Sequence, residues 1–406
     1  MQHGKAKKIF VVFTLLLVGL YFAPKVFPAS YVSKDETEKI VSENTEETTL
    51  VETEVTEEKI ATHVETPSAV KGIYITACAA STPSFRENLT KLVKETEINS
   101  VVIDIKDFSG TISIPVENEA LSVGLSGKGC KIPNIEEFIK DLHEDGVYVI
   151  GRITVFQDPL YAKANPNEAI KRISDGGLWA DKNGLNYLYP GSQKVWEYIS
   201  TLAKESYAMG FDEINFDYIR FPSDGNIKDM KVETGEGKTK ADIVESFFAF
   251  IYNDLKETGI VTSADLFGMT TTNTDDLGIG QVLERALPYF DFVCPMVYPS
   301  HYPSNFNGWS NPNAHPYDLI KFVMTSAVNR TNTLKNDPLL DEEVSSRINP
   351  PQLRPWLQNF SLGQPPYGSY EISEQIRATY DSNLTSWLLW DASNKYTNTK
   401  GAVSPI

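Results

Sequence analysis

From Val70 onwards, short runs of β-branched and other apolar residues alternate with longer amphipathic segments, and this alternation constrains the fold more than any other feature. The apolar runs predict eight strands, at 72–76, 100–106, 148–156, 213–219, 261–267, 292–298, 353–360 and 386–391. The segments between them predict helices at 84–97, 134–145, 192–209, 238–258, 277–289, 315–328 and 371–382. Strands that alternate with helices are typical of a parallel sheet with crossover helices. Eight such units predict an α/β fold, a (β/α)8 TIM barrel. An open doubly wound sheet is the alternative, disfavoured because no Gly-x-Gly-x-x-Gly turn follows the first strand.

Two segments of different composition precede the predicted barrel. Three lysines before residue 9 and the apolar run 9–23 resemble a secretory signal, and we assign 1–29 to a signal peptide or an N-terminal membrane anchor. The run is short for a full span, but the bulky Phe27 disfavours cleavage near Ala29, so an uncleaved anchor is preferred. Residues 30–68 are rich in Glu and Thr, with eleven acids against three lysines between 34 and 67, and predict a disordered acidic linker. The barrel domain is then 69–406, exported and either secreted or held at the extracellular face of the membrane.

Charge and cysteine content exclude several classes of function. The net charge of −17 and the sequence pI of about 4.8 argue against nucleic acid as a partner. The three cysteines are widely spaced, which argues against a disulfide framework and against a zinc site. Cys78 and Cys294 lie in strand-like runs and are expected to be small buried hydrophobes, although a single disulfide stays open. We expect no metal and no cofactor.

Polar side chains gather where the predicted strands end. In a (β/α)8 barrel the catalytic residues lie at the C-terminal ends of the strands. A single Asp in such a place is commonly a helix cap or a turn former, but here six of the eight strands end in polar or aromatic residues. The pattern predicts an acidic cleft that also holds arginine and aromatic rings. The candidates are Asp104, Asp107, Arg152, Asp217, Arg220, Asp265, Tyr298, His301, Trp390 and Asn394.

The strand at 213–219 is the most informative of these. Because side chains alternate between the two faces of a strand, Glu213, Asn215 and Asp217 share the face that points into the barrel. The opposite face, which includes Tyr218, is expected to pack against helices. We interpret Glu213 and Asn215 as members of a buried polar network with Arg152, and Asp217 as a residue of the cleft.

The next strand supplies a second carboxyl group, Asp265, at the same mouth. Glycoside hydrolysis needs two carboxyl groups, one ionised as nucleophile or base and one protonated as general acid. Arg152 or Arg220 would keep Asp217 ionised, and a drier environment would keep Asp265 protonated. Whether such a pair retains or inverts the anomeric configuration depends on the separation of the two groups, and both outcomes stay open.

Aromatic and histidine side chains suggest a carbohydrate substrate. Tyr298 and Trp390 lie at strand ends, and Trp309 lies in a polar loop, where rings can stack on sugar faces. Core packing is the alternative for each of them. His301 follows the sixth strand and is expected to form hydrogen bonds or transfer a proton.

Several stretches resemble a known family, the glycoside hydrolases of bacterial envelope proteins that are assigned from sequence. The matching stretches are 101–110, 151–159, 210–222, 263–268, 295–302 and 387–396. The family is expected to form TIM barrels distantly similar to those of α-amylases and α-galactosidases. The resemblance implies a nucleophilic Asp at the end of the fourth strand, where this chain has Asp217, and a general acid after the fifth or sixth strand, where Asp265 is the candidate.

The stretch 211–219 also resembles the fourth-strand signature of chitinases. Asp212, Asn215 and Asp217 match its spacing, but Ile219 stands where that family has its catalytic Glu. Without this acid the substrate-assisted chitinase mechanism has no proton donor, so we exclude it.

The leading hypothesis is a glycosidase that cuts an envelope or environmental polysaccharide with Asp217 and Asp265. The alternative is a non-catalytic barrel that binds carbohydrate or serves as an envelope scaffold. A metal-dependent deacetylase or phosphodiesterase that uses the acidic residues is a weaker third hypothesis.

Overall fold

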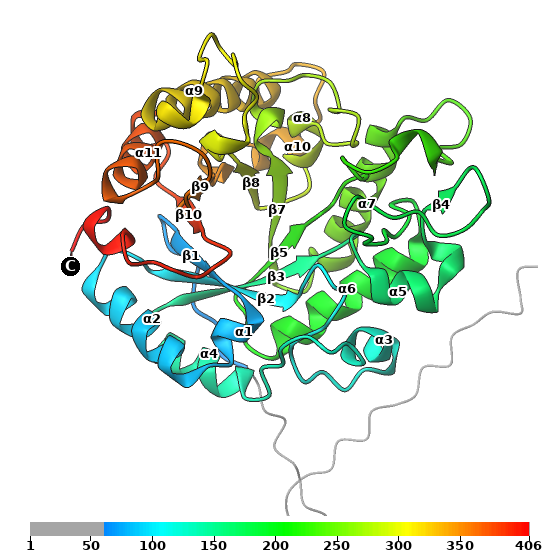
Figure 1. The fold of residues 1–406 in the computed structure, drawn as a ribbon, viewed down its shortest axis with the longest axis horizontal. Coiled ribbons are helices and arrows are strands. Elements are labelled where there is room, and N and C mark those ends of the chain that lie inside the picture. Colours follow the sequence, from blue (N-terminus) through cyan, green and yellow to red (C-terminus); the bar gives the residue numbers. More distant parts are fainter. Residues whose placement is uncertain (1–60, 406) are drawn as a thin grey trace, which may run out of the picture. The chain divides into compact units, whose positions relative to one another are not determined.

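The structure is a computed structural model that describes residues 61–405. Its centre is a closed barrel of parallel strands, with the order β1-β10-β9-β8-β7-β5-β3-β2 around the ring (Figure 1). The strands are β1 (Lys71–Ile75), β2 (Ser100–Lys106), β3 (Tyr148–Thr154), β5 (Glu213–Asp217), β7 (Val261–Phe267), β8 (Phe292–Met296), β9 (Trp356–Gln358) and β10 (Trp387–Trp390). The predicted barrel is confirmed, and the open sheet is wrong because β1 pairs with both β2 and β10.

Helices surround the barrel and cover its outer face (Figure 1). The longer ones are α2 (Pro83–Glu95), α4 (Ile135–Glu144), α6 (Gln193–Ala208), α7 (Lys240–Leu255), α9 (Pro316–Lys335) and α11 (Ser369–Asp381). Each coincides closely with a predicted helix, although α9 continues further. The helix predicted at 277–289 is wrong over its first half, since only α8 (Leu283–Ala286) forms. Gly278 and Gly280 have φ of 70° and 86° there, which a right-handed helix does not allow.

Shorter elements occupy the loops and were not predicted. They are the helices α1 (Ala77–Ala80), α3 (Ser122–Leu125), α5 (Pro159–Ala164) and α10 (Glu342–Arg347), and the strands β4 (Lys171–Arg172) and β6 (Met230–Lys231). β4 and β6 pair with each other, and they lie in the segments that follow β3 and β5. After β10 the described chain forms only a short 3-10 helix, Thr399–Gly401.

Inside the barrel, a polar network fills the end at which the strands begin. Arg354 donates from Nη1 to Glu213 Oε1 at 2.8 Å, and the hydroxyl of Tyr148 donates to Glu213 Oε2 at 3.2 Å. The network expected around Glu213 exists, but the expected partner Arg152 is wrong. Arg152 pairs in register with Asn215, two residues further along β5, so its side chain lies one layer closer to the mouth.

The first described residues pack against the same end of the barrel. The amide of Val64 donates to Asp212 Oδ1 at 2.7 Å, and Thr66 Oγ1 lies 3.0 Å from the hydroxyl of Tyr148. The ring of His63 stacks on Tyr207 with 3.9 Å between ring centres. Residues 61–68 of the predicted linker therefore contact the barrel, whereas the predicted segment 1–29 and the rest of the linker lie outside the described residues. Between 61 and 405, no helix has the length and apolar character needed to cross a membrane.

The cysteines differ from expectation in one respect. Cys78 and Cys130 form a disulfide. The expectation that Cys78 is a buried hydrophobe is wrong, because β1 ends at Ile75 and Cys78 lies on the exposed side of α1. Cys294 is free and fully buried in β8, as predicted.

Candidate functional site

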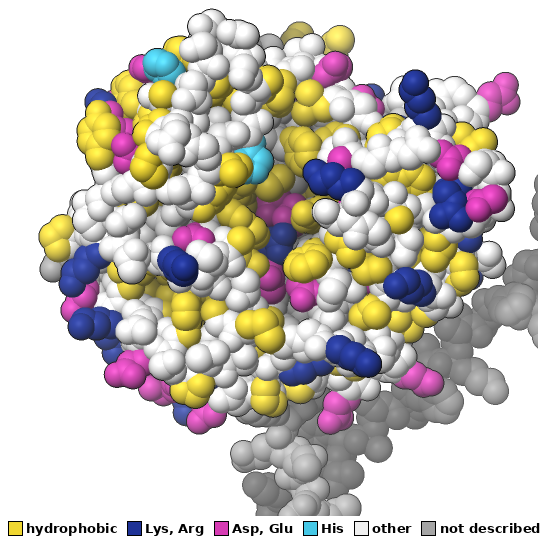
Figure 2. All heavy atoms as spheres, in the orientation of Figure 1, with side chains coloured by type: hydrophobic (Ala, Val, Ile, Leu, Met, Phe, Trp, Pro, Cys, Tyr) yellow, Lys and Arg dark blue, Asp and Glu magenta, His cyan; other side chains and the backbone are white. Residues whose placement is uncertain are grey.

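A cavity of about 420 Å³ opens at the mouth where the strands end. Figure 2 shows the hollow near the middle of this face, with acidic and basic side chains at its bottom and hydrophobic side chains around it. We call it the central cavity. It brings together most of the predicted site residues, and its polar and aromatic lining includes Arg152, Asp217, Tyr218, Arg220, Asp265, Tyr298, His301, Tyr302 and Trp390.

Asp217 ends β5 and is bound through both of its carboxylate oxygens. Oδ2 accepts hydrogen bonds from Nε of Arg152 at 3.2 Å and from Nη2 of the same guanidinium, while Oδ1 accepts from the amide of Tyr218 at 2.6 Å. Only 4% of Asp217 is exposed. The ion pair that the sequence led us to expect is thus formed by Arg152, which β3 places beside β5.

Arg152 also binds a second carboxylate. Its Nη1 donates to Asp104 Oδ1 at 2.6 Å, and the hydroxyl of Tyr74 donates to Asp104 Oδ2 at 2.5 Å. Burial alone would lower the pKa of the Arg152 guanidinium, but the charges of Asp217 and Asp104 outweigh this effect and hold the pKa well above its usual range. Asp104 thus acts on the cavity through Arg152. Burial raises the pKa of Asp104.

Asp265 lies on β7 and is 1% exposed. Its Oδ1 accepts hydrogen bonds from Asn215 Nδ2 at 2.9 Å and from Trp356 Nε1 at 2.8 Å. Burial raises the pKa of Asp265 well above its usual range, and the charge of Asp217 raises it further. Arg152 and the two hydrogen bonds act in the opposite direction but do not cancel this effect. Burial and the neighbouring charge of Asp217 therefore favour the protonated form of Asp265.

The backbone at Tyr218 departs from the strand and redirects the following residues. Tyr218 has φ of 55°, a left-handed conformation that ends the alternation of β5 at Asp217. The expectation that Tyr218 packs outward is therefore wrong, and its ring lines the central cavity. Arg220 follows, with its guanidinium 4.9 Å from the ring centre of Tyr218 and 4.5 Å from that of Phe267. Its Nη1 donates to the carbonyl of Phe221 at 3.1 Å.

Aromatic rings form another part of the wall. Trp390, at the end of β10, stacks on Tyr74 with 3.9 Å between ring centres and an angle of 19°. Tyr298 follows β8, and the ring of His301 lies edge-on to it at 5.3 Å. Partial burial lowers the pKa of His301, and its Nδ1 lies 3.1 Å from Ser300 Oγ. Neutral His301 and the rings offer surfaces for hydroxyl groups and sugar faces.

Four predicted residues do not line the cavity; one of them is Asp104, the second partner of Arg152 described above. Trp309 stacks on His315 with 5.4 Å between ring centres and also packs against Phe322. Asp107 accepts hydrogen bonds from the amide and hydroxyl of Ser109 and shapes a turn. Asn394 donates to the carbonyl of Tyr74 at 3.1 Å, and so ties the loop after β10 to the end of β1.

Sequence reasoning missed two residues that support the site. Tyr74 orients Asp104, and Trp356 donates its indole N–H to Asp265. A buried tryptophan usually needs a hydrogen-bond acceptor for its indole N–H. This requirement could have pointed from Trp356 to a polar residue on a facing strand.

Comparison with known proteins places this arrangement in a family. A family model described as "Putative glycosyl hydrolase domain" matches residues 72–396, from the second residue of β1 to the loop after β10. The chain belongs to this family. The family match covers every residue that lines the central cavity. Among proteins with curated descriptions, none matches the chain.

Solved structures similar to this chain include a glycoside hydrolase domain and a protein described as hypothetical. The glycoside hydrolase domain of PgaB (BpsB) from Bordetella bronchiseptica is 12% identical, covers 82% of this chain and 97% of its own length, and has a TM-score of 0.56. A hypothetical protein from Ruminiclostridium thermocellum is 33% identical and covers 51% of this chain and 98% of its own, with a TM-score of 0.44. The likeness to the PgaB domain shows a shared fold.

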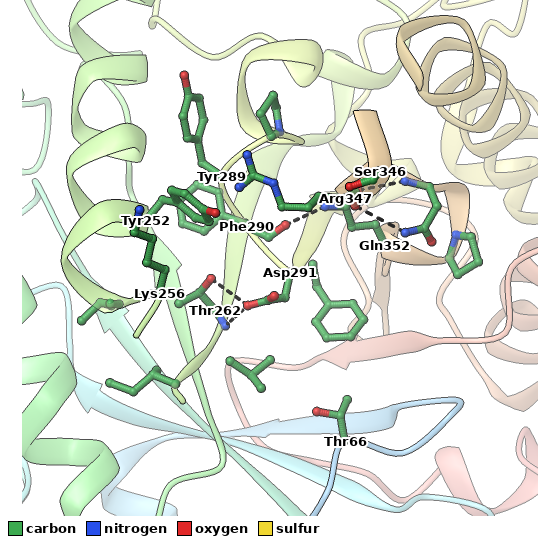
Figure 3. A pocket seen from close by; sticks show the side chains of 17 residues that line it. Thr66, Tyr252, Lys256, Thr262, Tyr289, Phe290, Asp291, Ser346, Arg347 and Gln352 are labelled. Carbon is green, nitrogen blue, oxygen red and sulfur yellow. Dashed lines mark hydrogen bonds between the residues drawn. The ribbon is translucent and has the colours of Figure 1, made fainter. Parts of the chain in front are cut away.

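A larger cavity of this glycosyl hydrolase domain, of about 670 Å³, lies at the opposite end of the barrel (Figure 3). It surrounds the starts of β7 and β8, where Asp291 accepts hydrogen bonds from the amide and hydroxyl of Thr262 at 2.8 and 3.1 Å. The guanidinium of Arg347 lies 4.4 Å from the ring centre of Tyr252. Despite its size we do not assign chemistry to it, because TIM barrels carry their active sites at the ends of the strands and none of the predicted site residues lines it.

Proposed function

We propose that the chain is a retaining glycosidase of a polysaccharide, with Asp217 as nucleophile and Asp265 as general acid and base. The observation that carries the proposal is the contrast between the two carboxyl groups. Asp217 is ion-paired with Arg152, whereas the pKa of Asp265 is raised by burial and by Asp217. Two carboxyl groups at one mouth, held in opposite protonation states, are the requirement of glycoside hydrolysis.

The position of the pair on neighbouring strands is compatible with retention. Phe216 and Ala264 are partners in register, and Asp217 and Asp265 follow them directly on strands about 4.8 Å apart. Retaining enzymes hold their carboxyl groups about 5–5.5 Å apart, whereas inverting enzymes need roughly 6.5–9.5 Å to admit a water molecule.

In the first step, a carboxylate oxygen of Asp217 bonds to the anomeric carbon while the glycosidic C–O bond breaks. Asp265 gives its proton to the departing oxygen, which leaves as an alcohol. The product is a glycosyl ester of Asp217 and an ionised Asp265. Because the ester has no charge, the influence of Asp217 that raised the pKa of Asp265 disappears at this point.

In the second step, Asp265 takes a proton from water, and the water oxygen bonds to the anomeric carbon as the ester bond breaks. This restores ionised Asp217 and protonated Asp265 and releases a sugar of the original configuration. Arg152 stays bound to Asp217 and Asp104 and fixes the nucleophile. Arg220, His301 and Trp390, which line the cavity, position the sugar rings.

The test is digestion of a panel of soluble polysaccharides with residues 61–406, wild type beside Asp217→Asn and Asp265→Asn. Each variant should lose at least about 100-fold in rate, the usual contribution of such a group. Asp107→Asn is the matched control, because Asp107 is an acid at a strand end that lies outside the cavity. Azide should restore turnover to Asp217→Ala as a glycosyl azide, and proton NMR should show a first product of unchanged anomeric configuration. Turnover by Asp217→Asn at the wild-type rate would contradict the assignment, and binding without turnover by the wild type would favour a carbohydrate-binding barrel.

We also propose that the chain is exported, through residues 1–29, to the outer face of the membrane or beyond. The basic and apolar composition of 1–29 supports this, and so does the disulfide between Cys78 and Cys130, since disulfides persist mainly in oxidising compartments. Fractionation of a bacterial host that expresses the full chain tests it. Recovery of the protein in the cytosolic fraction with both cysteines reduced would contradict export.

A further inference from the structure

Two further cavities adjoin the central cavity on the same face. One, of about 450 Å³, shares Tyr218 and Arg220 with it and is called here the β5-side cavity. The other, of about 600 Å³, shares His301 and Trp390 with it and is called the β10-side cavity. Since each outer cavity shares lining residues with the central one, the three cavities are adjacent, and we call this row of cavities the trough.

The strand order shows that the trough crosses the whole mouth. The β5-side cavity is lined by residues that follow β2, β3 and β5, whereas the β10-side cavity is lined by residues that follow β8, β9 and β10. In the order β1-β10-β9-β8-β7-β5-β3-β2, the β3–β5 side is opposite the β9–β10 side. Asp217 and Asp265 line the middle section. The carboxyl pair therefore has a binding surface on each side of it.

The two outer cavities share a chemical character that suits sugar rings. Each exposes a large apolar side chain, Phe108 with 56% of its surface exposed in one and Leu362 with 52% in the other. The remaining lining includes amide and hydroxyl groups, and its charged side chains balance in number: Asp181 and Asp224 against Lys182 and Arg220 in the β5-side cavity, and Asp391 against Lys395 in the β10-side cavity. The one described lysine of the β5-side cavity, Lys182, is paired with Asp224 at 3.0 Å. An apolar surface among hydrogen-bonding groups of little net charge matches the faces and hydroxyl groups of a glycan.

We propose that the trough binds one extended glycan chain and that the carboxyl pair cuts it at an internal bond. The cutting step of this inference rests on the proposed function, whereas the binding of the glycan does not. A site that removes terminal sugars is closed on one side of the bond that it cuts, whereas here both sides are open and lined. Phe108 and Leu362 then act as binding residues at opposite ends of the chain.

The experiment uses the panel polymer that the wild-type domain cuts or, if it cuts none, the polymer that it binds. Size-exclusion chromatography follows the mean chain length while the new reducing ends are counted. Internal cutting shortens the polymer several-fold when only a small percentage of bonds is broken. In parallel, calorimetry with Asp217→Asn measures affinity for a ladder of oligosaccharides from two to ten sugars of the same polymer.

Variants at the two ends give the sharpest comparison. Phe108→Ala and Leu362→Ala should each weaken binding of the longest oligosaccharide about five- to tenfold, the effect expected when a partly buried apolar contact is removed. Tyr370→Ala and Leu339→Ala are the controls, since these side chains are also exposed (68% and 92%) but line none of the three cavities. The control variants should bind like Asp217→Asn alone.

The outcomes separate the two proposals. Affinity that rises with length beyond the sugars that fill the central cavity, and that falls in both end variants, supports the trough even if no polymer is cut. Release of single sugars or disaccharides from an otherwise intact polymer, with no effect of either variant, overturns the trough and leaves the glycosidase standing. Absence of binding to every polymer of the panel overturns both.

Discussion

Asp217 and Asp265 carry the same carboxyl group, and only their surroundings make them different. Asp217 faces a guanidinium, whereas Asp265 faces an amide, an indole and the negative charge of Asp217. A buried carboxyl group that cannot find a cation keeps its proton. The proposed division of roles between the two residues therefore depends on Arg152, which stands on the β3 side of β5 and forms its ion pair with Asp217.

The first prediction concerns the pH dependence of activity. Because the pKa of Asp265 is raised, its acid form persists to higher pH than that of an ordinary carboxyl group, and the rate should fall when rising pH removes this proton. Asp265→Asn should abolish the alkaline limb together with most of the rate. A profile of kcat/KM between pH 4 and 10 checks this, and an unchanged alkaline limb in the residual activity of the variant would contradict it.

The second prediction concerns stability, and its sign follows from the same shift. Above about pH 3.9 the unfolded chain releases the Asp265 proton, while the folded chain keeps it up to the raised pKa. The free energy of unfolding therefore decreases as pH rises through this window. Asp265→Asn removes the loss, so at pH 7 it should raise the melting temperature by at least about 2 °C, the shift that roughly 1 kcal/mol produces in a large domain.

Calorimetry at pH 4 and pH 7 tests this second prediction. The gain from Asp265→Asn should be small at pH 4 and larger at pH 7. Asn can still accept the hydrogen bonds from Asn215 and Trp356, so lost contacts should not mask the effect. A variant less stable than wild type at pH 7 would show that Asp265 is ionised in the folded chain.

The third prediction concerns Arg152, which joins Asp104 and Asp217 in a buried cluster. Removal of one partner of a buried ion pair typically costs about 3–5 kcal/mol, because the remaining charges have no counterion. Arg152→Met should therefore lower the free energy of unfolding by about this amount and abolish activity. Asp104→Asn should cost less, since Arg152 keeps Asp217. Urea unfolding of the three proteins gives the comparison, and an equal loss in both variants would contradict it.

At the level of single residues, part of the site could be predicted from the sequence. The alternation of side chains along the strand was enough to predict that Glu213, Asn215 and Asp217 face inward, because the pleat of a strand places successive side chains on opposite faces. The partner of Glu213 was not predictable in the same way, since Arg354 lies 141 residues further along the chain and only the closed barrel brings the two together. Tyr218 was misplaced because nothing in the composition of the strand announced a left-handed residue at its end.

Among the elements, the disulfide links α1 to the loop before α4 across 52 residues of chain. A disulfide stabilises mainly by restricting the unfolded chain, typically by about 2–4 kcal/mol. Replacement of both Cys78 and Cys130 by Ser should lower the free energy of unfolding by that amount without loss of the barrel. Urea unfolding with circular dichroism measures the change. The wild type should show one free thiol, that of buried Cys294, and only after unfolding; three thiols before reduction would contradict the bond.

The strands were predicted better than the loops for a physical reason. The strands β2 and β3 are buried on both faces, so they are largely apolar runs that stand out in the sequence. The two-residue strands β4 and β6 are too short to show a period, and α8 is set by the glycine-rich turn before it. The disulfide was not predicted because Cys78 stands just after a strand, where the apolar pattern continues into α1.

For the domain as a whole, the contacts of residues 61–68 decide where the stable unit begins. Asp212 accepts a hydrogen bond from Val64 and lies 3.0 Å from His143 Nε2, and both of its oxygens are buried. A chain that starts at 69 should therefore melt several degrees below one that starts at 61, because it leaves a buried carboxylate oxygen without its donor. Differential scanning calorimetry compares the two. Equal melting temperatures would place the start of the domain at the predicted residue 69.

The carboxyl pair lies on barrel strands, whereas the outer cavities are lined by loops. The proposed bond cleavage and the choice of glycan therefore depend on different parts of the structure. The β5–β7 ladder pairs Phe216 with Ala264, the residues directly before Asp217 and Asp265, whereas the loops 181–187 and 391–398 line the ends of the trough. Loop grafts at either end can therefore be diversified as a library over an unchanged ladder. Such a library would vary the glycan that is bound, while the strands that carry the proposed catalytic residues Asp217 and Asp265 stay unchanged.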